Sequence, residues 1–149
     1  MITRYDPADF HQLLETWEES VRATHVFLQE VDIILYRGIL QGFDFTSFPV
    51  FCLKDVPDKL IGFMGVAGNK LEMLFLRPNY IGKGLGRKMM DFALNELQVE
   101  KVDVNEHNAK ALAFYTSYGF RVVNRRPIDD HGKAYPILEM ELARKTLSR

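Results

Sequence analysis

The stretch "LFLRPNYIGKGLGRKMMDFAL", residues 74–94, decides the fold because it sets a glycine-rich turn between an apolar run and an amphipathic helical pattern. Gly82, Gly84 and Gly86 stand at alternating positions. Glycine is costly in backbone entropy unless the chain needs unusual dihedral angles or close approach to a ligand. Where such a loop enters a helix, amide N–H groups and the positive end of the helix dipole favour an anion. The turn therefore predicts a phosphate-binding site.

Two other phosphate-binding loops fit the spacing less well. A P-loop ends in Gly-Lys-Ser/Thr, whereas Gly86 is followed by Arg87. A dinucleotide-binding fingerprint reads G-x-G-x-x-G and follows its strand almost directly. This turn reads G-x-G-x-G instead, and "RPNYI" separates it from the apolar run. Asp103 nevertheless stands about 20 residues further on, where a ribose-binding acid is expected. A dinucleotide-binding oxidoreductase therefore stays open as an alternative.

The size and charge of the chain are typical of a small soluble enzyme. With 149 residues, the chain is expected to form one domain over residues 1–149. A net charge of −1 provides no long-range field for nucleic acid or for an anionic membrane, so neither is expected as a partner. There is no apolar run of signal-peptide length at the start or of the ~20 residues that span a bilayer. We therefore expect a cytoplasmic protein.

Cysteine and histidine usage predicts no metal site. The single cysteine, Cys52, lies in the apolar "PVFCL" and is expected to be a buried structural thiol. The four histidines share no metal-ligand spacing with one another or with Cys52. They are His11, His25, His107 and His131.

Apolar periodicity predicts alternating helices and strands. Asp6 and Pro7 begin a first helix that extends to about Arg22, and a second helix ends near Gly42. The pattern of the second helix places a set of apolar residues on one side: Leu28, Val31, Ile34, Leu35 and Ile39.

The rest of the chain reads as a strand meander followed by mixed elements. Strands are expected at "PVFCLKD" (49–55), "KLIGFMGVAG" (59–68), "NKLEMLFL" (69–76), "KVDV" (101–104), "RVVNR" (121–125) and "PILEMEL" (136–142), and helices at 84–97 and in "NEHNAKALAFYTSYGF" (105–120). The first two strands should form an antiparallel hairpin, and Gly119 should stop the last helix. The sum is an α+β domain on a mixed, mostly antiparallel sheet with about four flanking helices.

Residues 74–94 followed by "VNEHNAKALAFYTSYGF", residues 104–120, resemble the coenzyme A binding core of the GNAT superfamily of N-acetyltransferases. The layout is similar to that of its bacterial YjaB-like members. The resemblance implies the GNAT acyl-CoA N-acyltransferase fold with acetyl-CoA as cosubstrate. It also implies direct transfer of the acetyl group, in a ternary complex, to a primary amine of a small metabolite or a protein. The identity of the acceptor stays open, as does a homodimer.

The resemblance also assigns residues to acetyl-CoA. The backbone of the strand 74–76 would pair with the pantetheine arm, the loop would hold the pyrophosphate, and Asn108 would hydrogen-bond the coenzyme. The implied cofactor-binding residues are Leu74, Phe75, Leu76, Gly82, Lys83, Gly84, Leu85, Gly86, Arg87, Asn108 and Tyr115. The family pattern is Arg/Gln-x-x-Gly-x-Gly, and Ile81 stands at the Arg/Gln position. Because this removes one polar contact, a non-catalytic coenzyme A sensor is a second alternative.

Acetyl transfer requires a neutral amine and a stabilised thiolate. Tyr115 matches the general-acid tyrosine of the family, and a phenol with a pKa of ~10 is protonated at neutral pH. Because an amine with a pKa of ~10.4 is almost fully protonated at pH 7, a base is useful. Asp103, Glu72 and His25 are the candidates, with a bound water chain as the remaining possibility.

Overall fold

The computed structural model describes residues 1–55 and 58–143. The chain divides into two compact units, Met1–Val99 and Glu100–Arg149. No helix in the described ranges combines the length and the apolar character that crossing a membrane requires.

The first unit contains a strand meander and its covering helices. Its elements are β1 (Ile2–Arg4), η1 (Pro7–Asp9), α1 (Phe10–Thr24), α2 (Glu30–Gln41), β2 (Val50–Asp55), β3 (Lys59–Ala67), β4 (Lys70–Leu76), η2 (Pro78–Tyr80) and α3 (Leu85–Asn95). The strands follow the order β1-β2-β3-β4, and each neighbouring pair is antiparallel. The predicted hairpin and the third adjacent strand are therefore confirmed.

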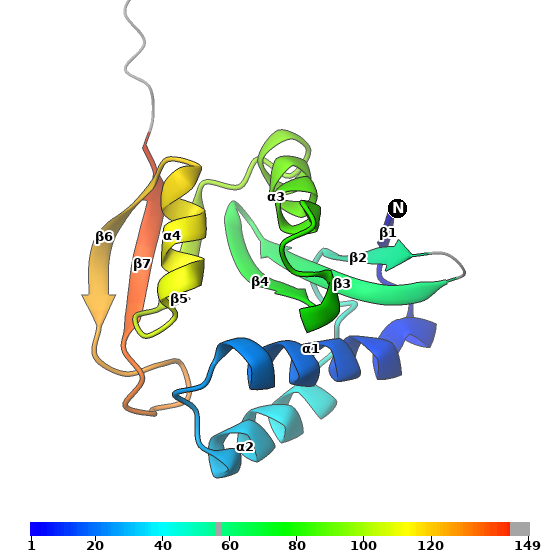
Figure 1. Cartoon of the computed structure of the whole chain (residues 1–149), viewed down its shortest axis with the longest axis horizontal. Helices are drawn as coiled ribbons and strands as arrows, with labels where there is room; N and C mark the ends of the chain where they lie inside the picture. Colours follow the sequence, from blue (N-terminus) through cyan, green and yellow to red (C-terminus); the bar gives the residue numbers. More distant parts are fainter. Residues whose placement is uncertain (56–57, 144–149) are drawn as a thin grey trace, which may run out of the picture. The chain divides into compact units, whose positions relative to one another are not determined.

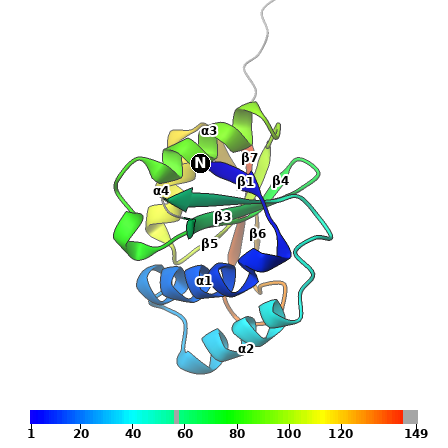
Figure 2. The ribbon, with the colours of Figure 1, turned by 90° about the vertical axis from the view of Figure 1, so that its right-hand side faces the viewer.

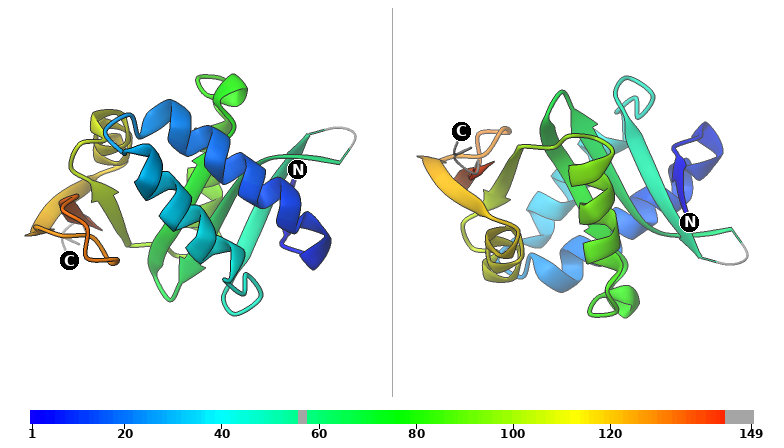
Figure 3. Two further views of the ribbon diagram at one scale, coloured as in Figure 1. Left: turned by 90° about the horizontal axis from the view of Figure 1, so that it is seen from below. Right: turned by 90° about the horizontal axis from the view of Figure 1, so that it is seen from above.

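Helices cover both faces of this sheet. Helices α1 and α2 lie side by side on one face, and α3 lies on the other (Figures 1 and 2). The two views of Figure 3 show these faces in turn. Because β3 is covered on both faces, seven of its nine residues are buried, from Leu60 to Val66. This double burial explains why β3 reads as a continuous apolar run rather than an alternating pattern.

The core under α1 and α2 is formed by aliphatic and aromatic side chains from both helices and the sheet. It consists of Leu13, Trp17, Val21, Ile33, Phe45, Val50, Cys52, Leu60 and Phe63. On the opposite face, Met89, Met90 and Ala93 of α3 are fully buried, and the rings of Phe51 and Phe92 lie 5.2 Å apart. Cys52 is buried as predicted, and burial raises the pKa of its thiol to about 12.

The first helix begins as its sequence predicts. The carboxylate of Asp6 accepts a hydrogen bond from the backbone N–H of Ala8 (N to Oδ1, 2.9 Å), and Asp9 accepts one from the N–H of Asp6. Pro7 occupies the first turn, where its missing N–H has no cost. The helix starts with a 3-10 turn, and the regular α1 follows to Thr24.

The structure buries a different side of α2 from the one that the apolar pattern marks. Ile33 is 5% exposed and lies in the core, whereas Val31 and Ile34 are 62% and 61% exposed. The buried side also includes Asp32, whose carboxylate accepts a hydrogen bond from the N–H of Gln29 at the start of the helix (3.3 Å). Contact with α1, rather than the count of apolar residues, therefore decides which side faces inward.

The strand β1 was not predicted. Its three residues pair with β2, with Thr3 opposite Cys52. A strand of three residues is too short to show a period of two, so the sequence carries little signal for it.

The second unit is a three-stranded antiparallel sheet with one helix. Its elements are β5 (Lys101–Asn105), α4 (Ala109–Ser117), β6 (Phe120–Arg126) and β7 (Ile137–Leu142). The strands follow the order β5-β7-β6. Gly119 adopts a φ of 97°, which confirms its predicted role as the helix stop.

Candidate functional site

The glycine loop leads from β4 through η2 into the first turn of α3. Gly82 and Gly84 adopt φ values of 82° and 81°, a left-handed conformation that residues with a Cβ rarely adopt. Gly86 lies inside α3 and is not among the glycines with positive φ. Two of the three glycines therefore have the unusual dihedral angles that the sequence predicts.

The start of α3 exposes backbone donors. Gly84 occupies the N-cap position and provides no side-chain hydrogen bond to the first turn. The first N–H groups of an α-helix have no partner within the helix and carry the positive end of its dipole. Residues 81–84 are exposed, and the ammonium Nζ of Lys83 lies 5.7 Å from the ring centre of Tyr80. The geometry is suited to binding an anion such as a pyrophosphate.

Strand β4 places its half-buried residues Leu74, Phe75 and Leu76 directly before this loop. Within its unit, β4 is the outer strand of the sheet. The pairing with β3 is irregular, since Gly65 lies opposite Met73 and Val66 opposite Leu71. Glu72 is the extra residue of this β-bulge, with no residue opposite it on β3. Its side chain is exposed and lies 3.8 Å from the ammonium of Lys70.

His25 follows α1 and packs against β4. Its ring centre lies 6.4 Å from that of Phe75 and 5.4 Å from that of Phe27. Burial lowers the pKa of His25 to about 4, so the imidazole is neutral at pH 7. Two of the predicted residues, His25 and Phe75, are thus brought together in the first unit.

The hydrogen bonds of Thr24 fix the tautomer of His25. The hydroxyl of Thr24 donates to the carbonyl of Ser20 (2.8 Å) and also lies 2.8 Å from Nδ1 of His25. Because the hydroxyl hydrogen is used toward Ser20, Nδ1 is the donor in the second bond. The lone pair of the neutral ring is therefore on Nε2.

Asn108 and Tyr115 lie on one helix of the second unit. Asn108 caps α4, because its Oδ1 accepts a hydrogen bond from the N–H of Ala111 (3.2 Å). A ligand role through the Nδ2 donors would leave this cap in place. Seven residues later, two helical turns along the same side, Tyr115 packs edge-on against Phe114 and Phe120. Burial raises the pKa of Tyr115, which keeps its phenol protonated.

Asp103 lies on β5 and is part of an ion-pair network around Arg126. The Arg126 guanidinium lies 2.8 Å from Oδ2 of Asp103, 2.7 Å from Glu139 and 2.6 Å from Asp130. One oxygen of the Asp103 carboxylate is therefore already engaged by Arg126. This environment disfavours Asp103 as a base.

Arg77 is a buried, multiply bonded residue beside the loop that the sequence analysis did not single out. It follows β4 directly and is only 4% exposed, although arginine is rarely buried. Its Nη1 lies 2.6 Å from Glu15 and 2.9 Å from Glu19, and its Nε donates to the carbonyl of Leu60 (2.7 Å). In the sequence, the burial of Arg77 is marked only by its position directly after the apolar residues 74–76.

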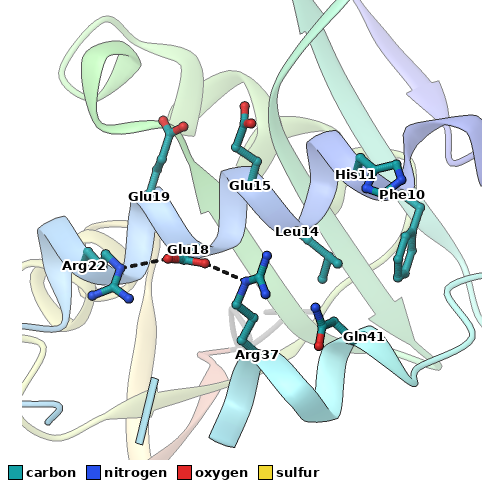
Figure 4. Close-up of a pocket in the computed structure, with 9 residues that line it drawn as sticks. All are labelled: Phe10, His11, Leu14, Glu15, Glu18, Glu19, Arg22, Arg37 and Gln41. Atoms are coloured by element: carbon teal, nitrogen blue, oxygen red, sulfur yellow. Dashed lines mark hydrogen bonds and ion pairs between the residues drawn. The ribbon is translucent and has the colours of Figure 1, made fainter. Parts of the chain in front are cut away.

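A pocket of about 540 Å³ lies between α1 and α2 (Figure 4). Its lining includes Glu18, which pairs with Arg22 and with Arg37 at 3.0 and 2.6 Å. None of the residues predicted for the site lines it. In the ranges that the structure describes, no three His, Cys, Asp or Glu residues are grouped as metal ligands.

Three comparisons with known proteins indicate the same family. A family model described as an acetyltransferase (GNAT) domain matches residues 47–142. The peptidyl-lysine N-acetyltransferase YjaB of Salmonella typhimurium is 35% identical over 132 residues, which cover 87% of this chain and 88% of that protein. YjaB of Escherichia coli K12 is 33% identical over 129 residues, covering 87% of each. The solution structure of apo-form YjaB from Escherichia coli aligns with a TM-score of 0.85 at 32% identity, covering 95% of each chain. These matches confirm the predicted fold class and exclude the dinucleotide-binding alternative.

Proposed function

Because the chain belongs to the GNAT family of acetyltransferases, we propose that it transfers the acetyl group of acetyl-CoA to the side-chain amine of lysine residues in proteins. The chain is an acetyl-CoA-dependent N-acetyltransferase, which sets aside the non-catalytic sensor. The protein acceptor is inferred from the two YjaB relatives, which are peptidyl-lysine N-acetyltransferases.

The glycine loop carries the proposal. Two left-handed glycines lead into an α3 N-terminus without a side-chain cap, so the amides from Gly82 to Arg87 supply the donors that a pyrophosphate needs. Because backbone groups provide most of this binding, Ile81 at the usual Arg/Gln position weakens it without abolishing it. Lys83 adds positive charge beside the loop.

The proposed reaction gives a role to the backbone of strand 74–76 and to Tyr115. The neutral amine attacks the thioester carbon, a C–N bond forms, and the C–S bond breaks to release the thiolate of coenzyme A. A backbone N–H of the strand 74–76 polarises the thioester oxygen as negative charge develops on it. Tyr115 donates a hydrogen bond to the departing sulfur. Since its pKa is raised above that of an ordinary thiol (~8.5), stabilisation by this bond is more favourable than full proton transfer.

The general base for the attacking amine has four candidates, which are the three predicted residues and water. Asp103 is held by Arg126, and Glu72 is exposed at a bulge. His25 has a lone pair on Nε2, but its pKa of about 4 makes it a weak base for an amine. We assign His25 to orient the amine or a water that carries the proton to solvent.

The remaining expectations belong to the same proposal. The protein acts in the cytoplasm as a single domain over residues 1–149, without a metal, a nucleic acid or a membrane partner. A homodimer is compatible with the proposal and is not required by it.

Calorimetry with a matched pair of glycine variants tests the proposal. Gly84 and Gly68 both have positive φ, 81° and 62°, and a Cβ would meet no atom within 4 Å at either position. Gly84→Ala and Gly68→Ala therefore carry a similar backbone strain. We expect Gly84→Ala to weaken acetyl-CoA binding about tenfold or more and Gly68→Ala to leave it unchanged.

The unchanged protein should also release thiol from acetyl-CoA when a lysine-containing peptide is added. Binding that is equally weakened in both glycine variants would argue against the loop as the pyrophosphate site. Thiol release that requires a small amine rather than a peptide would argue against the protein acceptor.

A further inference from the structure

Arg77 joins the start of the glycine loop to the body of the first unit. Its backbone N–H donates to the carbonyl of Ile61 on β3 (2.8 Å), and its carbonyl accepts from the N–H of Tyr80 in η2 (2.9 Å). Strand β4 has ended at Leu76, so Arg77 is the residue from which the loop departs.

The side chain of Arg77 is held by two other elements. On β3, the carbonyl of Leu60 accepts from Nε at 2.7 Å. On α1, Glu15 and Glu19 accept from Nη1, and the carbonyl of Gln12 lies 3.5 Å from Nη2. The rigid guanidinium fork makes these bonds at the same time, which a flexible ammonium could not do. Arg77 is therefore fixed in position and in direction.

The loop beyond Arg77 has little packing of its own. Asn79 and residues 81–84 are exposed, and the side chain of Tyr80 makes a long hydrogen bond to Asp55 on β2 (3.3 Å). Beyond the loop, Met89 and Met90 of α3 enter the core and anchor the chain again. Since a loop without a core takes its course from its ends, the direction of Arg77 affects where the amides of Gly82 to Arg87 lie.

We propose that Arg77, held by Glu15 and Glu19, is a positioning residue for the pyrophosphate-binding loop. It touches no ligand and acts through the course of the chain from Pro78 to Gly84. This inference rests on the proposed function, because it assumes that the loop binds the pyrophosphate of acetyl-CoA.

The ion pairs can be weakened without removing the buried cation. Glu15 and Glu19 are 61% and 47% exposed, so Glu15→Gln with Glu19→Gln keeps the shape of the site and is expected to fold. Glu18→Gln is the matched control, because Glu18 lies on the same helix and pairs with Arg22 and Arg37 instead. Figure 4 shows Glu15 and Glu19 pointing to one side of α1 and Glu18 pointing toward the two arginines. Arg77→Lys tests whether charge alone is sufficient.

The experiment compares coenzyme A with pantetheine, which lacks the pyrophosphate and the nucleotide. Dissociation constants are measured for the unchanged protein, the double glutamine variant, Glu18→Gln and Arg77→Lys. We expect the double variant and Arg77→Lys to weaken coenzyme A binding about tenfold, with pantetheine binding unchanged. The KM for acetyl-CoA should rise while kcat changes little.

Equal weakening toward both ligands would mean that Arg77 only stabilises the fold, and it would overturn the inference. Unchanged coenzyme A binding in the double variant and in Arg77→Lys would also overturn it. If the unchanged protein bound no coenzyme A, the proposed function itself would fail, which is a different result from a loss confined to the variants.

Discussion

At the scale of a single residue, the burial of His25 makes the stability of the folded protein depend on pH. Its pKa is lowered from the ordinary 6.5 to about 4 because the side chain is desolvated in the folded protein. Between these values the unfolded chain binds a proton that the folded chain does not bind. Stability therefore rises with pH through this window and is lost as the pH falls from 6.5 toward 4.

We predict that this single group makes the protein less stable at pH 5 than at pH 7.5 by roughly 2 kcal/mol. Urea unfolding at both pH values measures the change, and His25→Gln should reduce it by that amount. His131→Gln, at an exposed histidine, is the control for replacing an imidazole by an amide. A His25→Gln variant with the full pH dependence would contradict the assignment.

Tyr115 permits a second test at this scale. Tyr115→Phe removes only the hydroxyl and keeps the ring that packs on Phe114 and Phe120. We predict that kcat falls by about 100-fold while the dissociation constant of acetyl-CoA is unchanged, because in the proposed reaction the hydroxyl acts on the departing sulfur. The control is Tyr118→Phe, one turn further along. Steady-state kinetics with equal kcat in the Tyr115 variant and the unchanged protein would remove the role of Tyr115.

At the scale of secondary structure, periodicity predicts which segments form helices and strands but not always which side is buried. In α3, Met89 and Ala93 lie on the predicted apolar side and are buried. In α2, the adjacent residues Ile33 and Ile34 lie on different sides, and the apolar pattern marks the side of Ile34. The structure buries Ile33, because that side meets α1 and the core around Trp17. Such a choice depends on tertiary contact, which a local pattern does not contain.

This pair of isoleucines provides a prediction with an internal control. Ile33→Ala leaves a cavity in the core and should lower the free energy of unfolding by about 2–4 kcal/mol. Ile34→Ala, one residue along the same helix, removes a side chain that is 61% exposed and should cost less than about 1 kcal/mol. Denaturant unfolding of both variants measures the difference. Equal losses would mean that the two sides of α2 are buried to a similar extent.

At the scale of the whole molecule, the fold class was predictable because the glycine turn and the helix of Asn108 and Tyr115 are local motifs. The connections of Arg77 were not predictable, since its partners Glu15 and Glu19 lie 62 and 58 positions away in the chain. A buried cation and its carboxylates leave no common signal in sequence at such a distance. The same holds for the network of Asp103 with Arg126, which are 23 positions apart.

The single-domain expectation concerns how the two units unfold. The second unit, Glu100–Arg149, is in the size range below ~60 residues where a chain buries only about 60% of its surface and is marginally stable alone, and most of β6 is exposed. We therefore predict that both units unfold together.

Two probes test this prediction. The fluorescence of Trp17, the only tryptophan, reports on the first unit, and hydrogen exchange in Ile137–Leu142 reports on the second. The two urea transitions should coincide, and acetyl-CoA should shift both to the same extent, because a ligand stabilises the whole cooperative unit that binds it. Separate midpoints, or a shift confined to one probe, would show two independent domains.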